Sequence, residues 1–146
     1  MQNYHETDPE FAERFDHFAF DEVVNEPGQQ LEPVTRHMAI LATLLGCQGK
    51  EEFAEELPRA LDAGLTPVMV KEVVYQAVDY LGIGRVRPFL DLTNEELTRR
   101  GVALPLEPQA TTTMDDRLEK GAQAQAAIFG PQMLDCLLYT SPSPRD

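Results

Sequence analysis

The sequence contains two cysteine thiols, Cys47 and Cys136, the side chains best suited to nucleophilic or redox chemistry. They do not form a Cys-x-x-Cys pair. Cys47 follows Gly46 at the end of a predicted apolar helix, where the partial negative charge of the helix end disfavours a thiolate. We therefore interpret Cys47 as a buried structural cysteine, with a single peroxidatic or regulatory thiol as the alternative. His37 is not expected to activate it, because ten residues along a helix give about 15 Å of rise.

Acid–base chemistry is the second possibility, and Glu56 is its candidate residue. Glu56 ends the run EEFAEE and would act as a general acid or base if the fold buried it. We expect, however, that Glu56 belongs to a solvated acidic helix face, and the acid–base role is the alternative. Arg36 and Tyr75 are candidate substrate-binding residues, and Arg85 could meet a substrate carboxylate. Each of the three could instead have a structural role, and an arginine could simply pair with one of the many acids of the chain.

A metal site receives little support from the sequence. Glu13 and His17 have the i, i+4 spacing of metal-binding helices, with Asp16 and Asp21 nearby. No second histidine lies at ligand spacing, however. We predict neither a bound metal nor a cofactor.

Helical segments separated by proline and glycine must position these residues. Apolar residues recur every three or four positions, and no stretch has the alternation of a half-buried strand. Asp8-Pro9 and Thr66-Pro67 are typical helix starts, whereas Gly64 is typical of a helix end. Pro58 and Pro88 are expected to bend their helices. The prediction is an all-α protein of about six helices, the second of them buried on most sides. The approximate ranges are 9–24, 33–45, 50–63, 66–81, 85–100 and 113–129.

Composition restricts the possible partners. The chain has 146 residues, of which 42% are hydrophobic and 25% charged, as expected for a globular domain with a core. A net charge of −13 argues against binding to nucleic acid or to an anionic membrane surface. No apolar run approaches the roughly 20 residues of a membrane-spanning helix, and the polar start lacks the features of a signal peptide. We expect a cytoplasmic protein.

Three motifs in a fixed order resemble the carboxymuconolactone decarboxylase family, which includes alkylhydroperoxidase D-like proteins. The segment LEPVTRHMAILATLLG resembles the opening of a family helix, ALDAGLTP resembles the family hinge, and Tyr80-Leu81-Gly82 resembles the end of the next helix. The resemblance covers residues 31–101. It implies an alkylhydroperoxidase D-like helical unit that forms homo-oligomers, usually trimers or hexamers, and that acts on a small molecule.

The resemblance also implies where reactive residues should lie. Counting back from Gly64, the two cysteines of the peroxidase branch fall on Gly49 and Glu52, and the histidine falls on Glu56. The sequence has neither the two cysteines nor the histidine at these positions, which excludes a two-cysteine mechanism within this unit. The lactone decarboxylase branch also lacks the cysteines, and it is thought to use a polar pocket with a histidine near the position of Glu56.

The resemblance leaves two hypotheses for function. The protein is either an enzyme with peroxiredoxin-type or lactone decarboxylase activity, or the non-catalytic, oligomerising half of a tandem protein. The segment RLEKGAQAQAAIFGPQM resembles the opening of a second family unit.

The end of the chain breaks the helical pattern. The last eleven residues, CLLYTSPSPRD, resemble a translated sequencing-library adapter, and a natural Ser/Pro-rich tail is the alternative. Cys136 would then not belong to the natural protein, and the second unit would be truncated. The expected organisation is an N-terminal helix in 1–30, the family unit in 31–101, a linker in 102–113, the start of a second unit in 114–135, and the adapter-like tail in 136–146.

Overall fold

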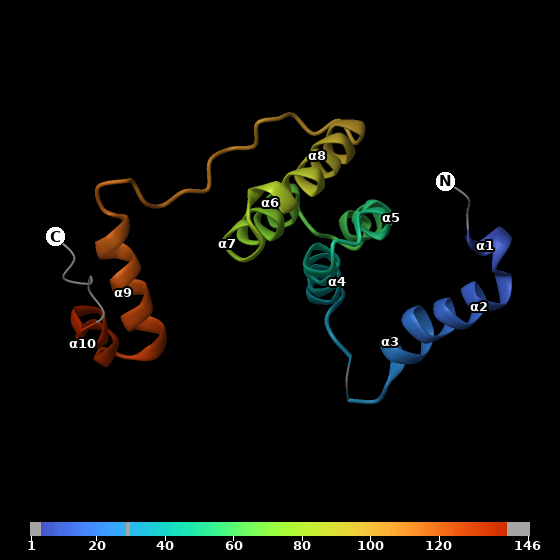
Figure 1. Cartoon of the computed structure of the whole chain (residues 1–146), viewed down its shortest axis with the longest axis horizontal. Helices are drawn as coiled ribbons and strands as arrows, with labels where there is room; N and C mark the ends of the chain where they lie inside the picture. Colours follow the sequence, from blue (N-terminus) through green and yellow to red (C-terminus); the bar gives the residue numbers. More distant parts are fainter. Residues whose placement is uncertain (1–3, 29, 140–146) are drawn as a thin grey trace. The chain divides into compact units, whose positions relative to one another are not determined.

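The computed structural model describes residues 4–28 and 30–139, with side chains as far as residue 135, and all regular structure within them is helical (Figure 1). The predicted all-α class is confirmed. Two compact units are formed by Met1–Leu106 and Glu107–Asp146. Among the described residues, no helix combines the length and hydropathy that a bilayer crossing requires. The elements of the first unit are α1 Tyr4–Thr7, α2 Pro9–His17, the π-helix η1 Phe18–Glu22, α3 Val23–Asn25, α4 Pro33–Cys47, α5 Lys50–Asp62, α6 Pro67–Gln76, α7 Val78–Leu81 and α8 Ile83–Arg99.

The core of the first unit lies among α4, α5, α6 and α8. These helices contact one another in the pairs α4–α5, α4–α6, α5–α8 and α6–α8, as Figure 1 shows. Phe53 of α5 and Phe89 of α8 meet edge to face at its centre, with ring centroids 5.1 Å apart and an interplanar angle of 84°. The buried hydrophobic cluster consists of Leu41, Leu45, Phe53, Leu57, Ala60, Leu65, Val70, Val74, Val86 and Phe89.

The predicted hinge between the third and fourth predicted helices is present. Gly64 has φ +108°, a left-handed conformation that disfavours residues with a Cβ. The N–H of Leu65 reaches back to the carbonyl of Ala60 at 3.1 Å and closes the end of α5. Thr66 then caps α6, since its hydroxyl accepts a hydrogen bond from the N–H of Met69 at 3.2 Å.

Several helix boundaries differ from the sequence prediction. The segment expected as one helix over 66–81 is interrupted by a turn at Ala77, which separates α6 from α7. The first predicted helix contains the five-residue π-helix η1, which periodicity at 3.6 residues does not reveal. Both α5 and α8 continue through their internal prolines, Pro58 and Pro88. The expected burial of α4 on most sides is wrong, because only Leu41 and Leu45 are fully buried on it.

An ion-pair network joins the ends of α5 and α8. The Glu96 carboxylate accepts hydrogen bonds from Arg99 at 2.7 Å and from Arg100 at 2.6 Å. Arg100 also donates to Asp62 of α5 at 2.6 Å and to the carbonyl of Pro58 at 3.0 Å. Hydrogen bonding, from Arg99 first and also from Arg100, holds the pKa of Glu96 below its ordinary value of 4.5.

The second unit contains α9 (Arg117–Phe129) and α10 (Gln132–Tyr139), which contact each other. Thr113 and Asp116 form the predicted capping box, in which the N–H of each residue donates to the side chain of the other, at 2.6 and 3.4 Å. Leu118 and Phe129 on α9 are 82% and 63% exposed. The side chain of Cys136 and the whole of residues 140–146 lie outside the described residues.

The aromatic contact at the centre of the core gives a stability prediction. Phe89→Ala removes a side chain that is 2% exposed and should lower the free energy of unfolding by about 3–5 kcal/mol. Urea denaturation of the purified chain measures this. Leu118→Ala removes a side chain that is 82% exposed and lines neither of the two cavities described below, and it should change stability by no more than about 0.5 kcal/mol. Equal effects of the two substitutions would contradict this assignment of the core.

The network around Glu96 gives a pH prediction. Because the pKa of Glu96 is lowered by folding, its contribution is complete above the ordinary value of 4.5 and is lost as the pH falls through the lower folded value. Glu96→Gln should therefore reduce stability at pH 7, and the difference from the wild type should shrink below pH 4.5. Urea denaturation between pH 3 and 7 measures it, with the exposed Glu95→Gln as control. A stability difference between Glu96→Gln and the wild type that does not change with pH would refute the lowered pKa of Glu96.

Candidate functional site

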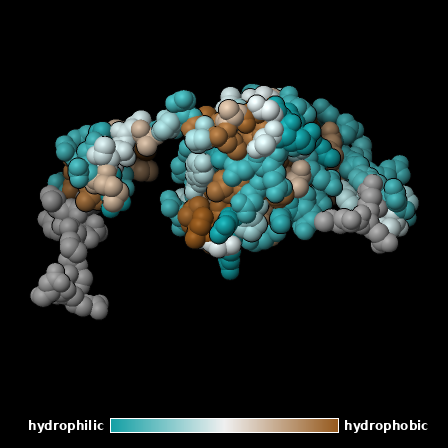
Figure 2. Space-filling model, turned by 90° about the horizontal axis from the view of Figure 1, so that it is seen from above, coloured by the Kyte–Doolittle hydropathy of each residue, from teal (hydrophilic) through white to brown (hydrophobic). Residues whose placement is uncertain are grey.

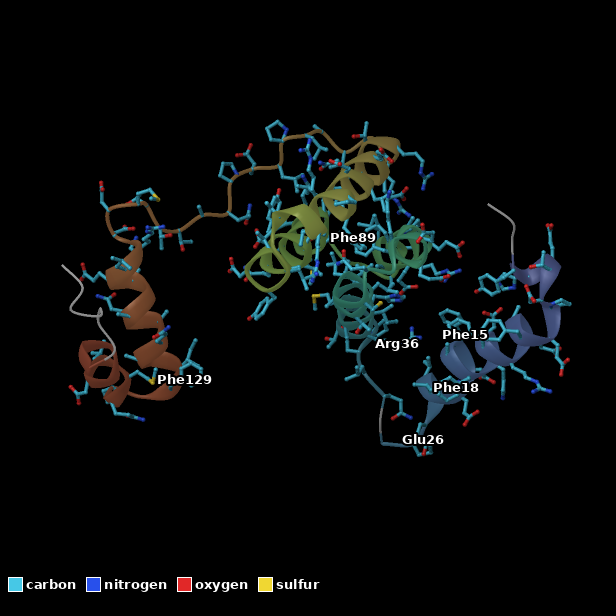
Figure 3. All side chains as sticks on the ribbon, in the orientation of Figure 1. Phe15, Phe18, Glu26, Arg36, Phe89 and Phe129 are labelled. Carbon is cyan, nitrogen blue, oxygen red and sulfur yellow. The ribbon has the colours of Figure 1, made fainter. Side chains whose placement is uncertain are left out.

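An open apolar cavity lies within the first unit, between the segment α2–η1–α3 and the helices α4 and α5. Its volume is about 680 Å³, within the range of about 300–1,000 Å³ typical of small-molecule sites. Figure 3 shows Arg36 on α4, and it shows Phe15 and Phe18 on the N-terminal helical segment, which consists of α1, α2, η1 and α3. The apolar lining of the cavity includes Phe11, Phe15, Phe18, Leu31, Ile40 and Leu44.

Glu56 of α5 lines the cavity, and behind it the side chain contacts His37 of α4. The Nδ1 atom of His37 and the Oε1 atom of Glu56 are 2.6 Å apart. Their side chains are only 14% and 5% exposed. The other carboxylate oxygen of Glu56 lies 3.6 Å from Nη1 of Arg59, and Glu56 and Arg59 line the cavity. The expectation of a solvated Glu56 is thus wrong, and the histidine and arginine offset the cost of burying its carboxylate.

Helical spacing brings His37 and Glu56 together. His37 lies four residues before Leu41, so it shares the face of α4 that packs into the core. Glu56 lies between the buried residues Phe53 and Leu57 on α5. The left-handed Gln48, with φ 61°, and the following Gly49 turn the chain so that α5 packs against α4. The polar pair is therefore part of the interface between these two helices.

Arg36 connects α4 to the π-helix. Its Nη2 atom donates to the carbonyl of Ala19 at 3.1 Å, in a part-buried contact. Within the described part of the chain, no carboxylate forms an ion pair with Arg36. Arg59 lies over the ring of Phe20, 5.4 Å from its centroid, which is a cation–π distance. Both arginines thus contact the N-terminal helical segment.

Aromatic rings form a continuous series along that segment. Successive ring centroids are 6.2 Å apart from Tyr4 to Phe11, 6.2 Å from Phe11 to Phe15, and 6.3 Å from Phe15 to Phe20. These rings line the cavity, yet the three phenylalanines are 63%, 41% and 42% exposed. Figure 2 shows hydrophobic residues at the surface among hydrophilic ones on the face in view. Large apolar side chains left exposed in one series are typical of a binding surface.

The structure brings together only two of the five residues proposed from the sequence, Arg36 and Glu56. Cys47 lines neither described cavity and is exposed, which corrects its interpretation as a buried cysteine. Its Sγ atom lies 3.6 Å from the carbonyl of Leu44. Tyr75 is 45% exposed on α6, with Nζ of Lys71 5.7 Å from its ring centroid. Arg85 is exposed in the first turn of α8.

Sequence reasoning missed the partner of Glu56 and most of the cavity wall. His37 is not expected to activate Cys47, and α4 is unbroken between the two residues. The available signal was the position of His37 and Glu56 on the apolar faces of consecutive helices. Among the described residues, no group of three or more His, Cys, Asp or Glu side chains could hold a metal ion.

A second apolar groove, of about 730 Å³, lies on the other side of α4. It is formed by α4, α6 and α7, and Met38, Ala42, Val73 and Tyr80 are among its lining residues. Apolar side chains lie on several sides of helix α4 because the helix borders both cavities. They do not mean that all of its sides are buried.

Comparison with known proteins gives one match. The sequence model of the carboxymuconolactone decarboxylase family matches residues 9–95, which include the N-terminal helical segment, α4, α5, α6 and most of α8. No curated protein and no solved structure matches the chain.

Proposed function

The chain belongs to the carboxymuconolactone decarboxylase family, and on this basis we propose that it is an acid–base enzyme of the lactone decarboxylase type rather than a thiol peroxidase. The observation that carries the proposal is the 2.6 Å contact between His37 and Glu56 at an apolar cavity. A histidine–carboxylate pair held in a site of low water content is suited to proton transfer.

Glu56 is the group that exchanges a proton with the substrate. When a carboxylated lactone loses carbon dioxide, the C–C bond breaks, its electron pair moves onto the lactone, and a proton must be added at carbon. Glu56 lines the cavity and supplies this proton in its protonated form. His37 is the positioning residue behind it, because it holds Oε1. Between turnovers it takes up a proton from water at Nε2 as it passes the Nδ1 proton to Glu56.

The two arginines and the apolar wall assist the same reaction. Arg36 and Arg59 line the cavity and supply positive charge for a substrate carboxylate and for the charge that develops on the lactone. The aromatic wall reduces the hydration of the reacting carboxylate, so that fixed protein groups replace water around it. Cys47 has no part in this mechanism.

Self-association is a second candidate function, and the groove between α4, α6 and α7 favours it. This groove is apolar and its residue Tyr80 is 87% exposed. We propose that it is an interface between copies of the chain, since burying such a surface is favourable. Association and catalysis are compatible, because the groove and the cavity share only Ala39 among their lining residues. If the chain associates but lacks activity, the structural hypothesis from the sequence is the better one.

The proposed chemistry predicts which substitutions affect turnover. Glu56→Gln keeps the size of the side chain but removes its proton, so the rate of carboxymuconolactone decarboxylation should fall about 10²- to 10⁴-fold. Release of carbon dioxide from the purified chain measures this. Cys47→Ala should leave the rate unchanged.

The same variants identify the peroxidase alternative. Consumption of hydrogen peroxide in the presence of a dithiol reductant is measured for the wild type and for Cys47→Ala. Peroxide consumption that disappears with Cys47→Ala, together with an unaltered decarboxylation rate in Glu56→Gln, would overturn the proposal in favour of thiol chemistry.

The proposed interface predicts the oligomeric state. Size-exclusion chromatography with light scattering should give a mass that is a multiple of 16.4 kDa. Ala42→Glu places a charge on an exposed position of the groove and should shift the mass toward the monomer. Glu51→Gln, outside the groove, is the control. A monomeric wild-type chain at micromolar concentration would contradict the assignment.

A further inference from the structure

We infer that the cavity binds an amphipathic carboxylic acid, with the carboxylate at Arg36 and a large apolar body along the phenylalanine series. This inference names the substrate class of the proposed site and rests on that proposed function. It follows from three features of the cavity: an arginine without an acidic partner, an uneven distribution of charge, and a row of exposed aromatic rings.

Arg36 differs from Arg59, the other arginine that lines the cavity, because Arg59 pairs with Glu55 and Glu56. Acidic residues outnumber Lys and Arg by 25 to 12, yet no carboxylate among the described residues forms an ion pair with Arg36. Its guanidinium is part-buried and uses one N–H to reach the carbonyl of Ala19. A guanidinium has five N–H donors in a fixed arrangement that matches a carboxylate. The remaining donors of Arg36 are therefore available to an anion in the cavity.

Charge is distributed unevenly along the cavity. At Tyr4, burial raises the pKa of the phenol, and the carboxylates of Glu52, Asp16 and Glu55 raise it further, against the effect of Arg59. The Tyr4 end is therefore acidic and disfavours a carboxylate. Arg36 provides a position for the anion that is not neutralised by an acidic partner. This difference fixes the direction in which an amphipathic anion lies.

The aromatic rings determine the rest of the ligand. Phe11, Phe15 and Phe18 are 63%, 41% and 56% exposed, and all three line the cavity. A small carboxylated lactone reaches Arg36 and Glu56 but leaves most of this surface in water. An acid with a long alkyl chain or a fused ring system covers it, and burial of apolar area is the main source of affinity for such a ligand. Glu56 remains able to react, because His37 and not Arg36 holds its Oε1 atom.

Calorimetric titration of the full chain with decanoate, decanol and acetate at pH 7.5 tests the inference. Decanoate carries the charge and the apolar body, decanol only the body, and acetate only the charge. Decanoate should bind about 10- to 100-fold more tightly than decanol, which corresponds to one hydrogen-bonded charged contact. Acetate should show no measurable binding. Equal affinities for decanoate and decanol would overturn the inference, as would the absence of decanoate binding.

Variants identify the residues responsible. Arg36→Gln should reduce decanoate affinity to that of decanol, and Arg36→Lys should restore part of it. Phe11→Ala should weaken the binding of both decanoate and decanol, because it removes part of the apolar wall. The ring is exposed, so its loss does not threaten the core. Arg14→Gln is the control, because Arg14 pairs with Glu10 on α2 and does not line the cavity. Unchanged decanoate binding in Arg36→Gln would overturn the inference. The inference would also be overturned if the chain bound no decanoate and Phe11→Ala changed the mass of the oligomer. That result would assign the aromatic rings to an interface with a second copy of the chain.

The binding test is separable from the proposed chemistry. Glu56→Gln should still bind decanoate more tightly than decanol, because Arg36 and the apolar wall remain. If Glu56→Gln retains full decarboxylase activity while Arg36→Gln loses decanoate binding, the acid–base proposal fails and the assignment of the ligand class stands. If Glu56→Gln is inactive and decanoate and decanol bind equally, the acid–base proposal stands and the assignment of the ligand class fails.

Discussion

The contact between His37 and Glu56 is the constraint on which the proposed site depends. A carboxylate that is 5% exposed requires a polar partner, and the histidine on the facing helix supplies it at 2.6 Å. The pair lies in the interface between α4 and α5, and Glu56 extends from it to the wall of the cavity. The cavity therefore has a carboxylate in its wall because the helix interface holds one.

Helix α4 has a double role that its composition conceals. It contributes Leu41 and Leu45 to the core, and its other sides border two apolar cavities. One cavity is lined by Arg36 and Glu56, and the other is a largely apolar groove whose lining includes the exposed Tyr80. The chemical difference between the two is the reason for assigning a ligand to the first and a copy of the chain to the second.

The sequence predicted the helices better than the site because helix ends are local signals. The hinge at Gly64 and Thr66-Pro67 and the capping box at Thr113 depend on residues within a few positions of one another. The partner of Glu56, in contrast, lies 19 residues away on another helix. Its identification requires the packing of α4 on α5, which periodicity alone does not provide. The π-helix was missed because a single five-residue turn within a helical segment leaves no distinct pattern in the sequence.

Nuclear magnetic resonance of the His37 side chain measures the contact between His37 and Glu56 in solution. Long-range proton–nitrogen spectra report which ring nitrogen carries a proton, and we expect a protonated Nδ1 that donates to Glu56. In Glu56→Gln the Nδ1 resonance should shift strongly, whereas the exposed control Glu55→Gln should leave it unchanged. A His37 ring whose resonances are the same in Glu56→Gln as in the wild type would contradict the account.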